Sequence, residues 1–155
     1  MLGGRQAEQI IMNQATTKAP AHLWIVGILA VLWNAMGAFD YSATQLKLEF
    51  YMAQFTQEQL DYFYSFPPWM KAAWAIAVWS SLLGSLCLLL RKSWAAGLFG
   101  LAILGLATSS VYNFVLSNGL EAMGSEGAMF TAVIWVIAFL LYFYAHAMAK
   151  RGVLQ

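Results

Sequence analysis

Four long runs of apolar residues, separated by polar segments, dominate the chain. Each run contains about the 20 residues that a helix needs to cross the hydrocarbon core of a bilayer. None of the runs alternates apolar and polar residues with the period of two that half-buried strands show. The pattern therefore predicts an all-α integral membrane protein, with a bundle of four transmembrane helices over residues 22–41, 69–90, 94–116 and 128–148.

The polar segments define the organisation around these helices. We expect a polar cytoplasmic N-terminal segment over residues 1–21, a four-helix domain over 22–149, an outer amphipathic loop over 42–68, and a cytoplasmic tail over 150–155. The first eleven residues differ in composition from the rest, so Met12 is an alternative to Met1 as the start.

The basic residues are distributed unevenly between the polar segments. Lys and Arg concentrate in the cytoplasmic flanks of membrane helices. Six of the eight basic residues lie before the first helix, between the second and third helices, or after the fourth: Arg5, Lys18, Arg91, Lys92, Lys150 and Arg151. Lys47 and Lys71 lie in the remaining polar segments. We therefore expect a multi-pass membrane protein with both termini in the cytoplasm.

The long loop over residues 42–68 is expected to be structured. Thr56 and Gln59 fit the capping box S/T-x-x-E/Q, which predicts a helix start near Gln57. Leu60, Phe63 and Tyr64 would then share one face of this helix. We expect an amphipathic surface helix segment that lies on the outer membrane surface or caps the bundle.

The stretch FPPWMK is interpreted as a corner that leads from this surface segment into the membrane. Pro67 and Pro68 would end the surface helix and start the second transmembrane helix, because proline suits the first helical position. An alternative role for the corner is a lip that gates a substrate. Aromatic and basic residues near the ends of the helices are expected to anchor them at the membrane interface: Trp24, Trp69, Lys71 and Trp94.

Small residues mark the faces through which membrane helices pack. They recur every four residues in the second helix and include spaced glycines in the third: Ala73, Ala77, Ser81, Ser85, Gly97 and Gly105. We therefore expect the second and third helices to form a tight antiparallel hairpin.

Polar residues within membrane helices are candidates for function. Asn34, Asp40 and Tyr41 lie toward the outer end of the first helix, and Tyr112 and Asn113 lie at similar depth in the third. One interpretation is an outer pocket between these helices that binds a small polar ligand or a lipid headgroup. The other interpretation is that these side chains form interhelical hydrogen bonds that fix the helix register.

Cofactor and metal sites have little support in the residue pattern. His22 and His146 are the two histidines, and as a pair they could ligate a b-type haem if their helices were neighbours. The alternative is that both are ordinary interfacial histidines. The single cysteine, Cys87, cannot form a disulfide within one chain. We expect no metal and no cofactor, with haem as a minor alternative.

Motifs of common enzyme classes do not occur in the chain. It has no G-x-S-x-G, no H-E-x-x-H, no Walker loop and no dinucleotide fingerprint. The net charge of +1 does not indicate nucleic-acid binding. Four transmembrane helices are too few for the inverted repeats of a secondary transporter, so transport would require an oligomer.

Several long stretches carry a resemblance to known proteins: HLWIVGILAVLWNAMGAFDY, YFYSFPPWMKAAWAIAVW, LGSLCLLLRKSWA and FTAVIWVIAFLLYFYAHAMAKRGVL. Over residues 20–154 the chain resembles a group of small proteobacterial inner-membrane proteins, many of them uncharacterised and some automatically labelled as sugar transporters. The arrangement of the helices is also similar to that of DoxX-like four-helix proteins, by analogy of architecture.

These observations favour a non-catalytic accessory or structural subunit of a larger bacterial membrane complex, respiratory or photosynthetic. Its expected partners are the lipid bilayer and other membrane-protein subunits, because aromatic residues are enriched at interface cores. The alternative is a small oligomeric transporter or ligand-binding membrane protein for a small polar solute. A redox subunit linked to haem or quinone is a third hypothesis.

Overall fold

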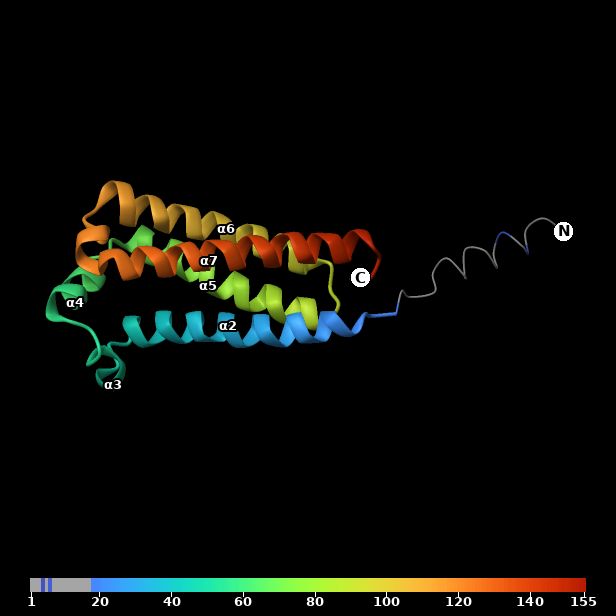
Figure 1. Ribbon diagram of the computed structural model, residues 1–155, viewed down its shortest axis with the longest axis horizontal. Helices are drawn as coiled ribbons and strands as arrows, with labels where there is room; N and C mark the ends of the chain where they lie inside the picture. The colour runs from blue at the N-terminus through green and yellow to red at the C-terminus, as the bar shows by residue number, and fades with distance from the viewer. Residues whose placement is uncertain (1–3, 5, 7–17) are drawn as a thin grey trace.

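The computed structural model describes Gly4, Gln6 and residues 18–155. Arg5 and the alternative start at Met12 lie outside the described residues. The described residues form an all-α bundle and contain no β-strand. Figure 1 shows the long helices side by side, with the short helices at one end and the C-terminus at the other.

The helices follow one another in the order that the sequence predicts. They are α2 (Ala21–Gln45), α3 (Glu49–Met52), α4 (Gln57–Tyr64), α5 (Pro68–Leu89), α6 (Trp94–Val111), the π-helical turn η1 (Tyr112–Leu116) and α7 (Gly119–Lys150). Within the described part of the chain, four helices are long and apolar enough to cross a membrane: α2, α5, α6 with η1, and α7. The predicted four-helix bundle is therefore confirmed.

The α5–α6 hairpin forms the centre of the bundle, with α2 packed on α5 and α7 packed on α6. The hairpin is tight because small residues face each other. A Cβ atom at Gly105 would lie 2.7 Å from the carbonyl oxygen of Ala73 and 2.8 Å from the backbone nitrogen of Ala77. Side chains at this crossing would force the two backbones apart, so glycine and alanine permit the close approach.

The small residues do not all lie at this interface. Ser85 is fully buried, and its hydroxyl donates to the carbonyl oxygen of Ser81 within α5. Gly97 is exposed, and a Cβ atom there would meet nothing within 4 Å. The packing role expected of Gly97 is not seen because Phe99 faces the hairpin instead, with its ring against Gly84.

The start of α7 differs from the expected boundary. The fourth membrane helix was predicted over residues 128–148, whereas α7 begins at Gly119. Gly124 has φ 68° and ψ −173°, a non-helical conformation that residues with a side chain rarely adopt. Two helical segments therefore meet at a kink at Gly124.

Residues 151–155, here called the C-terminal strap, pack against the bundle rather than extending from it as a free tail. Val153 and Leu154 are 3% and 5% exposed and belong to the core that includes Leu23 and Leu88. The backbone of Gln155 accepts from the N–H of Ser93 and donates to the carbonyl of Arg91. The strap therefore joins the end of α7 to the α5–α6 turn.

The two ends of the bundle are chemically distinct. The end that carries α3 and α4 is called the cap end, and the end that carries the C-terminal strap and the α5–α6 turn is called the strap end (Figure 1).

Replacement of Gly105 by alanine should lower the free energy of unfolding by about 1–3 kcal/mol, because the added methyl group overpacks the α5–α6 crossing. Gly97→Ala is the matched control in the same helix. It should leave stability unchanged or raise it by up to about 1 kcal/mol, since alanine is the better helix former. Reversible unfolding in a mild detergent, followed by circular dichroism, gives both values. Equal effects of the two substitutions would contradict the packing described.

Candidate functional site

The cap end is organised by local signals in the sequence. Thr56 and Gln59 form the predicted capping box, with the N–H of Gln59 3.2 Å from Thr56 Oγ1 and the N–H of Thr56 3.0 Å from Gln59 Oε1. Pro67 caps α5 and Pro68 is its first residue, as predicted for the start of the second long helix. These signals place α4 across the end of the bundle (Figure 1).

Tyr62 fixes α4 to the bundle. Its hydroxyl donates to Asn113 Oδ1 at 2.7 Å and lies 2.8 Å from Ser117 Oγ. A Cβ atom at Gly119 would come within 2.5 Å of the same hydroxyl, so the first residue of α7 must be small. The hydroxyl therefore joins three segments: α4, η1 and the start of α7. Single π-helical turns such as η1 occur frequently at functional sites.

The ionisation of Tyr62 is shifted by this environment. Burial raises the pKa of its hydroxyl, and the hydrogen bond with Ser117 opposes the shift only in part. The hydroxyl is therefore neutral at physiological pH and remains a donor.

A set of aromatic rings, here called the aromatic cap, surrounds this point. Neighbouring rings have centroids 5.1–6.5 Å apart, and most pairs meet edge to face: Phe39, Tyr41, Phe50, Tyr51, Phe55, Tyr62, Phe63, Phe66, Trp69, Trp74 and Tyr112. Edge-to-face pairs at these separations are favourable because the positive ring edge meets the negative face of its neighbour. The loop between α2 and α5 is consequently packed rather than free.

A second polar contact links α2 to α3. The Tyr51 hydroxyl donates to Asp40 Oδ1 at 2.7 Å. Burial, together with this hydrogen bond and the charge of Asp40, raises the pKa of Tyr51. Next to this pair, Lys47 places its ammonium 4.3 Å from the centre of the Tyr64 ring, which favours a cation–π contact with α4.

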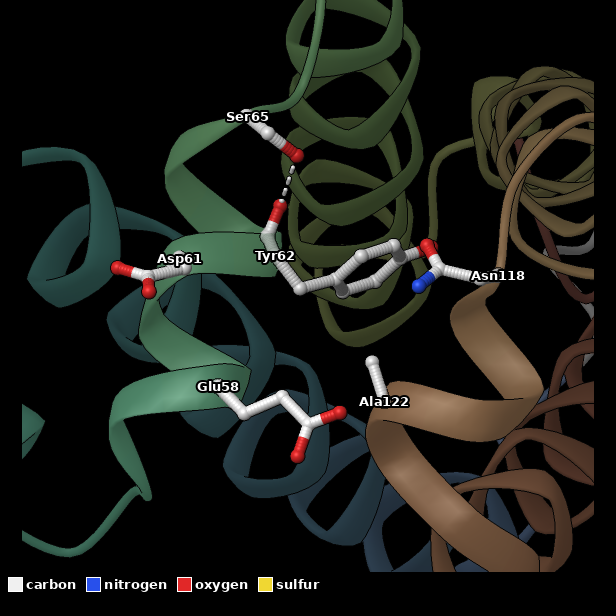
Figure 2. Close-up of a pocket in the computed structure, with 6 residues that line it drawn as sticks. All are labelled: Glu58, Asp61, Tyr62, Ser65, Asn118 and Ala122. Atoms are coloured by element: carbon white, nitrogen blue, oxygen red, sulfur yellow. Dashed lines mark hydrogen bonds between the residues drawn. The ribbon is translucent and has the colours of Figure 1, made fainter.

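A shallow hollow of about 450 Å³ lies between α4 and the start of α7. It is lined by Glu58, Asp61, Tyr62, Ser65, Asn118 and Ala122 (Figure 2). Figure 2 shows the Glu58 carboxylate directed across the hollow toward Ala122 and the Asp61 carboxylate directed away from it. Gln57 donates to Asp61 at 2.8 Å, so that carboxylate has a partner outside the hollow. Glu58 and the Asn118 amide could accept hydrogen bonds from the ammonium or hydroxyl group of a small solute.

The five residues expected to line an outer pocket do not line one cavity, because α5 lies between α2 and α6. Asn34 on α2 donates to Ser85 Oγ on α5 at 2.9 Å, and the Tyr41 ring packs on Trp74 of α5 at 5.1 Å. Asp40 is bonded to Tyr51 of α3. These contacts hold α2 against its neighbours, as the alternative interpretation of interhelical hydrogen bonds anticipated.

Tyr112 and Asn113 lie instead in the group around Tyr62. The Tyr112 ring packs on Phe66 and Trp69, at 5.5 and 5.4 Å, and Asn113 accepts from Tyr62. The structure thus divides the predicted pocket residues into one group on α2 and another at η1.

Tyr62 is the most buried residue of α4. It is 6% exposed, whereas Leu60, Phe63 and Tyr64 are half-buried. The apolar pattern alone did not single out Tyr62, because a tyrosine can be buried when its hydroxyl finds a partner. Phe66, which follows α4, is also 6% exposed and packs on the Tyr62 ring.

The two histidines do not face a common site. His22 Nδ1 lies 2.5 Å from the Tyr144 hydroxyl, and the His146 ring stacks on Tyr142 with centroids 5.9 Å apart. The side chains of residues 144 and 146 project from α7 in directions about 200° apart. His22 of α2 contacts Tyr144, whereas His146 projects from the opposite side of α7. Among the described residues, no group of three or more His, Cys, Asp or Glu side chains could hold a metal ion.

The expected interface anchors lie at the two ends of the helices. Trp24 and Trp94 are 46% and 77% exposed near the strap end, at the starts of α2 and α6. Trp69 is 47% exposed and Lys71 is half-buried near the cap end. These positions suit side chains at two membrane–water boundaries.

No family model matches the chain, and no curated protein or solved structure matches it either. Inferences about function therefore depend on the residues and contacts described above.

Tyr62→Phe should lower the free energy of unfolding by about 0.5–1.5 kcal/mol, because it removes the hydrogen bond from the buried Tyr62 hydroxyl to the half-buried Asn113. Tyr64→Phe is the control on the same helix, since the Tyr64 ring rather than its hydroxyl contacts Lys47. Hydrogen exchange of residues 57–64 reports the local opening of α4. Faster exchange in both variants alike would argue against the special role of the Tyr62 hydroxyl.

The raised pKa of Tyr62 also predicts a dependence of stability on pH. Its contribution is fully present below the ordinary tyrosine pKa of 10.0 and should be lost as the pH rises through the higher folded-state pKa. Ultraviolet absorbance of tyrosinate should show a late-titrating component in the folded protein. Tyr62→Phe should lack part of this component, and an unchanged titration curve would contradict the assignment.

Proposed function

We propose that the chain is a small multi-pass protein of a bacterial inner membrane, with the strap end and both termini in the cytoplasm. It acts as a non-catalytic accessory subunit that packs against other subunits of a larger respiratory or photosynthetic complex. The resemblance of its apolar segments to small proteobacterial inner-membrane proteins supports the choice of membrane. The excess of basic residues at the strap end supports the orientation.

The observation that carries this proposal is the uneven burial of α7. Only 11% of its most apolar window is buried, compared with 22–28% for the other three helices. Its buried residues occur near its two ends: Gly119 and Ala122 at the cap end, and Leu141, Ala145 and Met148 at the strap end. From Met123 to Leu140 no residue is buried. A long stretch of α7 is thus available to an external surface.

The exposed side chains of this stretch suit a protein partner. They are large and include aromatic rings and a methionine: Met129, Phe130, Val133, Val136, Phe139 and Leu140. Aromatic residues and methionine are enriched at the cores of protein interfaces. Within a bilayer these side chains gain by close packing rather than by leaving water. A transmembrane helix of matching shape would provide that packing.

The polar side chains within the bundle mostly satisfy one another. Asn34 donates to Ser85, and Trp135 Nε1 donates to Ser110 Oγ at 3.0 Å. Ser109 Oγ is, among the described residues, the buried side-chain polar atom without a hydrogen-bond partner. This arrangement supports a packing role over a polar pathway through the centre of the bundle.

A photo-crosslinking residue at Val136 should capture a discrete protein in the native membrane. Leu29 on α2 is the matched control, because Val136 and Leu29 are 58% and 60% exposed. The proposal predicts a protein adduct from position 136 and mainly lipid adducts from position 29. Mass spectrometry of the adduct identifies the partner subunit.

The second candidate function is a small oligomeric transporter or ligand-binding protein for a polar solute. The hollow beside Glu58 supports it, since a carboxylate and an amide converge there. Lipid adducts alone from both crosslinking positions, with the protein migrating as a small oligomer on a native gel, would favour this candidate over the accessory subunit.

A further inference from the structure

The strap end gathers two pairs of basic residues that are far apart in the sequence. Arg91 and Lys92 follow α5, whereas Lys150 ends α7 and Arg151 caps it. Both pairs lie at the strap end, where the strap packs on the α5–α6 turn: the backbone N–H of Gln155 lies 2.6 Å from the carbonyl oxygen of Arg91.

The helices α5 and α7 end with the same hydrogen-bond geometry at the strap end. In each, the second residue past the helix cap donates to a carbonyl of the last helical turn, at 2.7 Å from Lys92 to Cys87 and at 3.0 Å from Val153 to Met148. This is the Schellman turn, which satisfies carbonyls that a helix leaves unpaired. Both turns reverse the chain sharply, so the strap runs back toward the α5–α6 turn.

The backbone of Arg91 indicates that the attachment of the strap is specific. Schellman turns place one residue at positive φ, which glycine adopts readily, as Gly152 does with φ 70°. Arg91 occupies the equivalent position at φ 57°, where a side chain is unfavourable. Its side chain compensates, because Nε donates to the carbonyl oxygen of Val153 at 3.1 Å. A glycine at this position would adopt the same backbone angles but would lack the side chain that binds the strap.

The charges of the described residues are separated along the bundle. Its basic residues at the strap end are Lys18, Arg91, Lys92, Lys150 and Arg151. Its acidic residues all lie on the segments of the cap end: Asp40, Glu49, Glu58, Asp61, Glu121 and Glu126. Lys92 and Lys150 are exposed at the strap end, and the exposed Trp94 lies two residues after Lys92.

We propose that the strap end binds the phosphate group of an anionic phospholipid, with Lys92 and Lys150 as its principal charged contacts. Anionic lipids attract basic residues next to membrane helices. The exposed indole of Trp94 suits the same depth, because tryptophan prefers the headgroup region. The ligand must be negatively charged and amphiphilic, since the basic residues lie where apolar helices end.

This site would reinforce the least buried helix of the bundle. A phosphate that contacts both lysines would link the α5–α6 turn to the end of α7, in parallel with the strap. Because α7 has no buried residue from Met123 to Leu140, its buried contacts lie near its two ends. The bound lipid should therefore stabilise the whole fold. This inference is independent of any partner subunit.

The test uses the purified full-length chain in a neutral detergent, with phosphatidylglycerol or phosphatidylcholine of the same acyl chains. Native mass spectrometry should show preferential retention of phosphatidylglycerol, and the unfolding temperature should rise more with this lipid. The double substitution Lys92→Gln and Lys150→Gln should weaken phosphatidylglycerol binding about 25-fold. The double substitution Lys92→Arg and Lys150→Arg preserves the charges and should retain binding.

Lys47→Gln combined with Lys71→Gln is the matched control, because these two basic residues lie at the cap end. The proposal is overturned if the wild-type protein does not distinguish the two lipids, or if the control loses selectivity as much as the Lys92 and Lys150 variant. Inorganic phosphate at the same concentration distinguishes the source of the ligand. If phosphate alone reproduces the stabilisation, the site binds a free anion and the lipid assignment fails.

Discussion

The close approach of α5 and α6 at Gly105 is the contact on which the bundle depends. Lipid offers helices no gain from burying apolar surface, so their association relies on packing. A Cβ atom at Gly105 would meet the backbone of Ala73 and Ala77 within 3.1 Å, and no comparable backbone contact occurs at the other helical glycines described within α2, α5 and α6. Since α2 packs on α5 and α7 on α6, the hairpin positions both outer helices.

The two outer helices are attached by different means. α2 is held along its length by buried small residues from Gly27 to Ala43 and by the hydrogen bond from Asn34 to Ser85. The buried residues of α7 lie near its ends, where Tyr62 packs against Gly119 at the cap end and the C-terminal strap docks at the other, and between them Trp135 donates to Ser110 of α6. Between these attachments it is the helix most able to adapt to a neighbour. Because few residues of α7 are buried within the bundle, α7 is the best candidate for an interface with another protein.

The sequence predicts the features that depend on neighbouring residues. The four apolar helices, the capping box at Thr56 and the helix start at Pro67 and Pro68 each require only local spacing or composition, and each is found. The hydrogen bond of Tyr62 to Asn113 could not be predicted in the same way, because 51 residues separate its partners. The docking of the strap depends likewise on the turn at Arg91, which no periodic pattern encodes.

The separation of charge connects the topology of the protein to its chemistry. Basic residues direct a helix end to the cytoplasm during insertion, and afterwards they remain next to the anionic lipids of that leaflet. At the strap end these residues also stand beside the turns that fasten α7. In the proposed orientation and with the proposed lipid site, insertion, lipid contact and the attachment of α7 would depend on the same few side chains. The cap end has a different chemistry, because it carries the acidic residues, the hollow beside Glu58 and the aromatic cap.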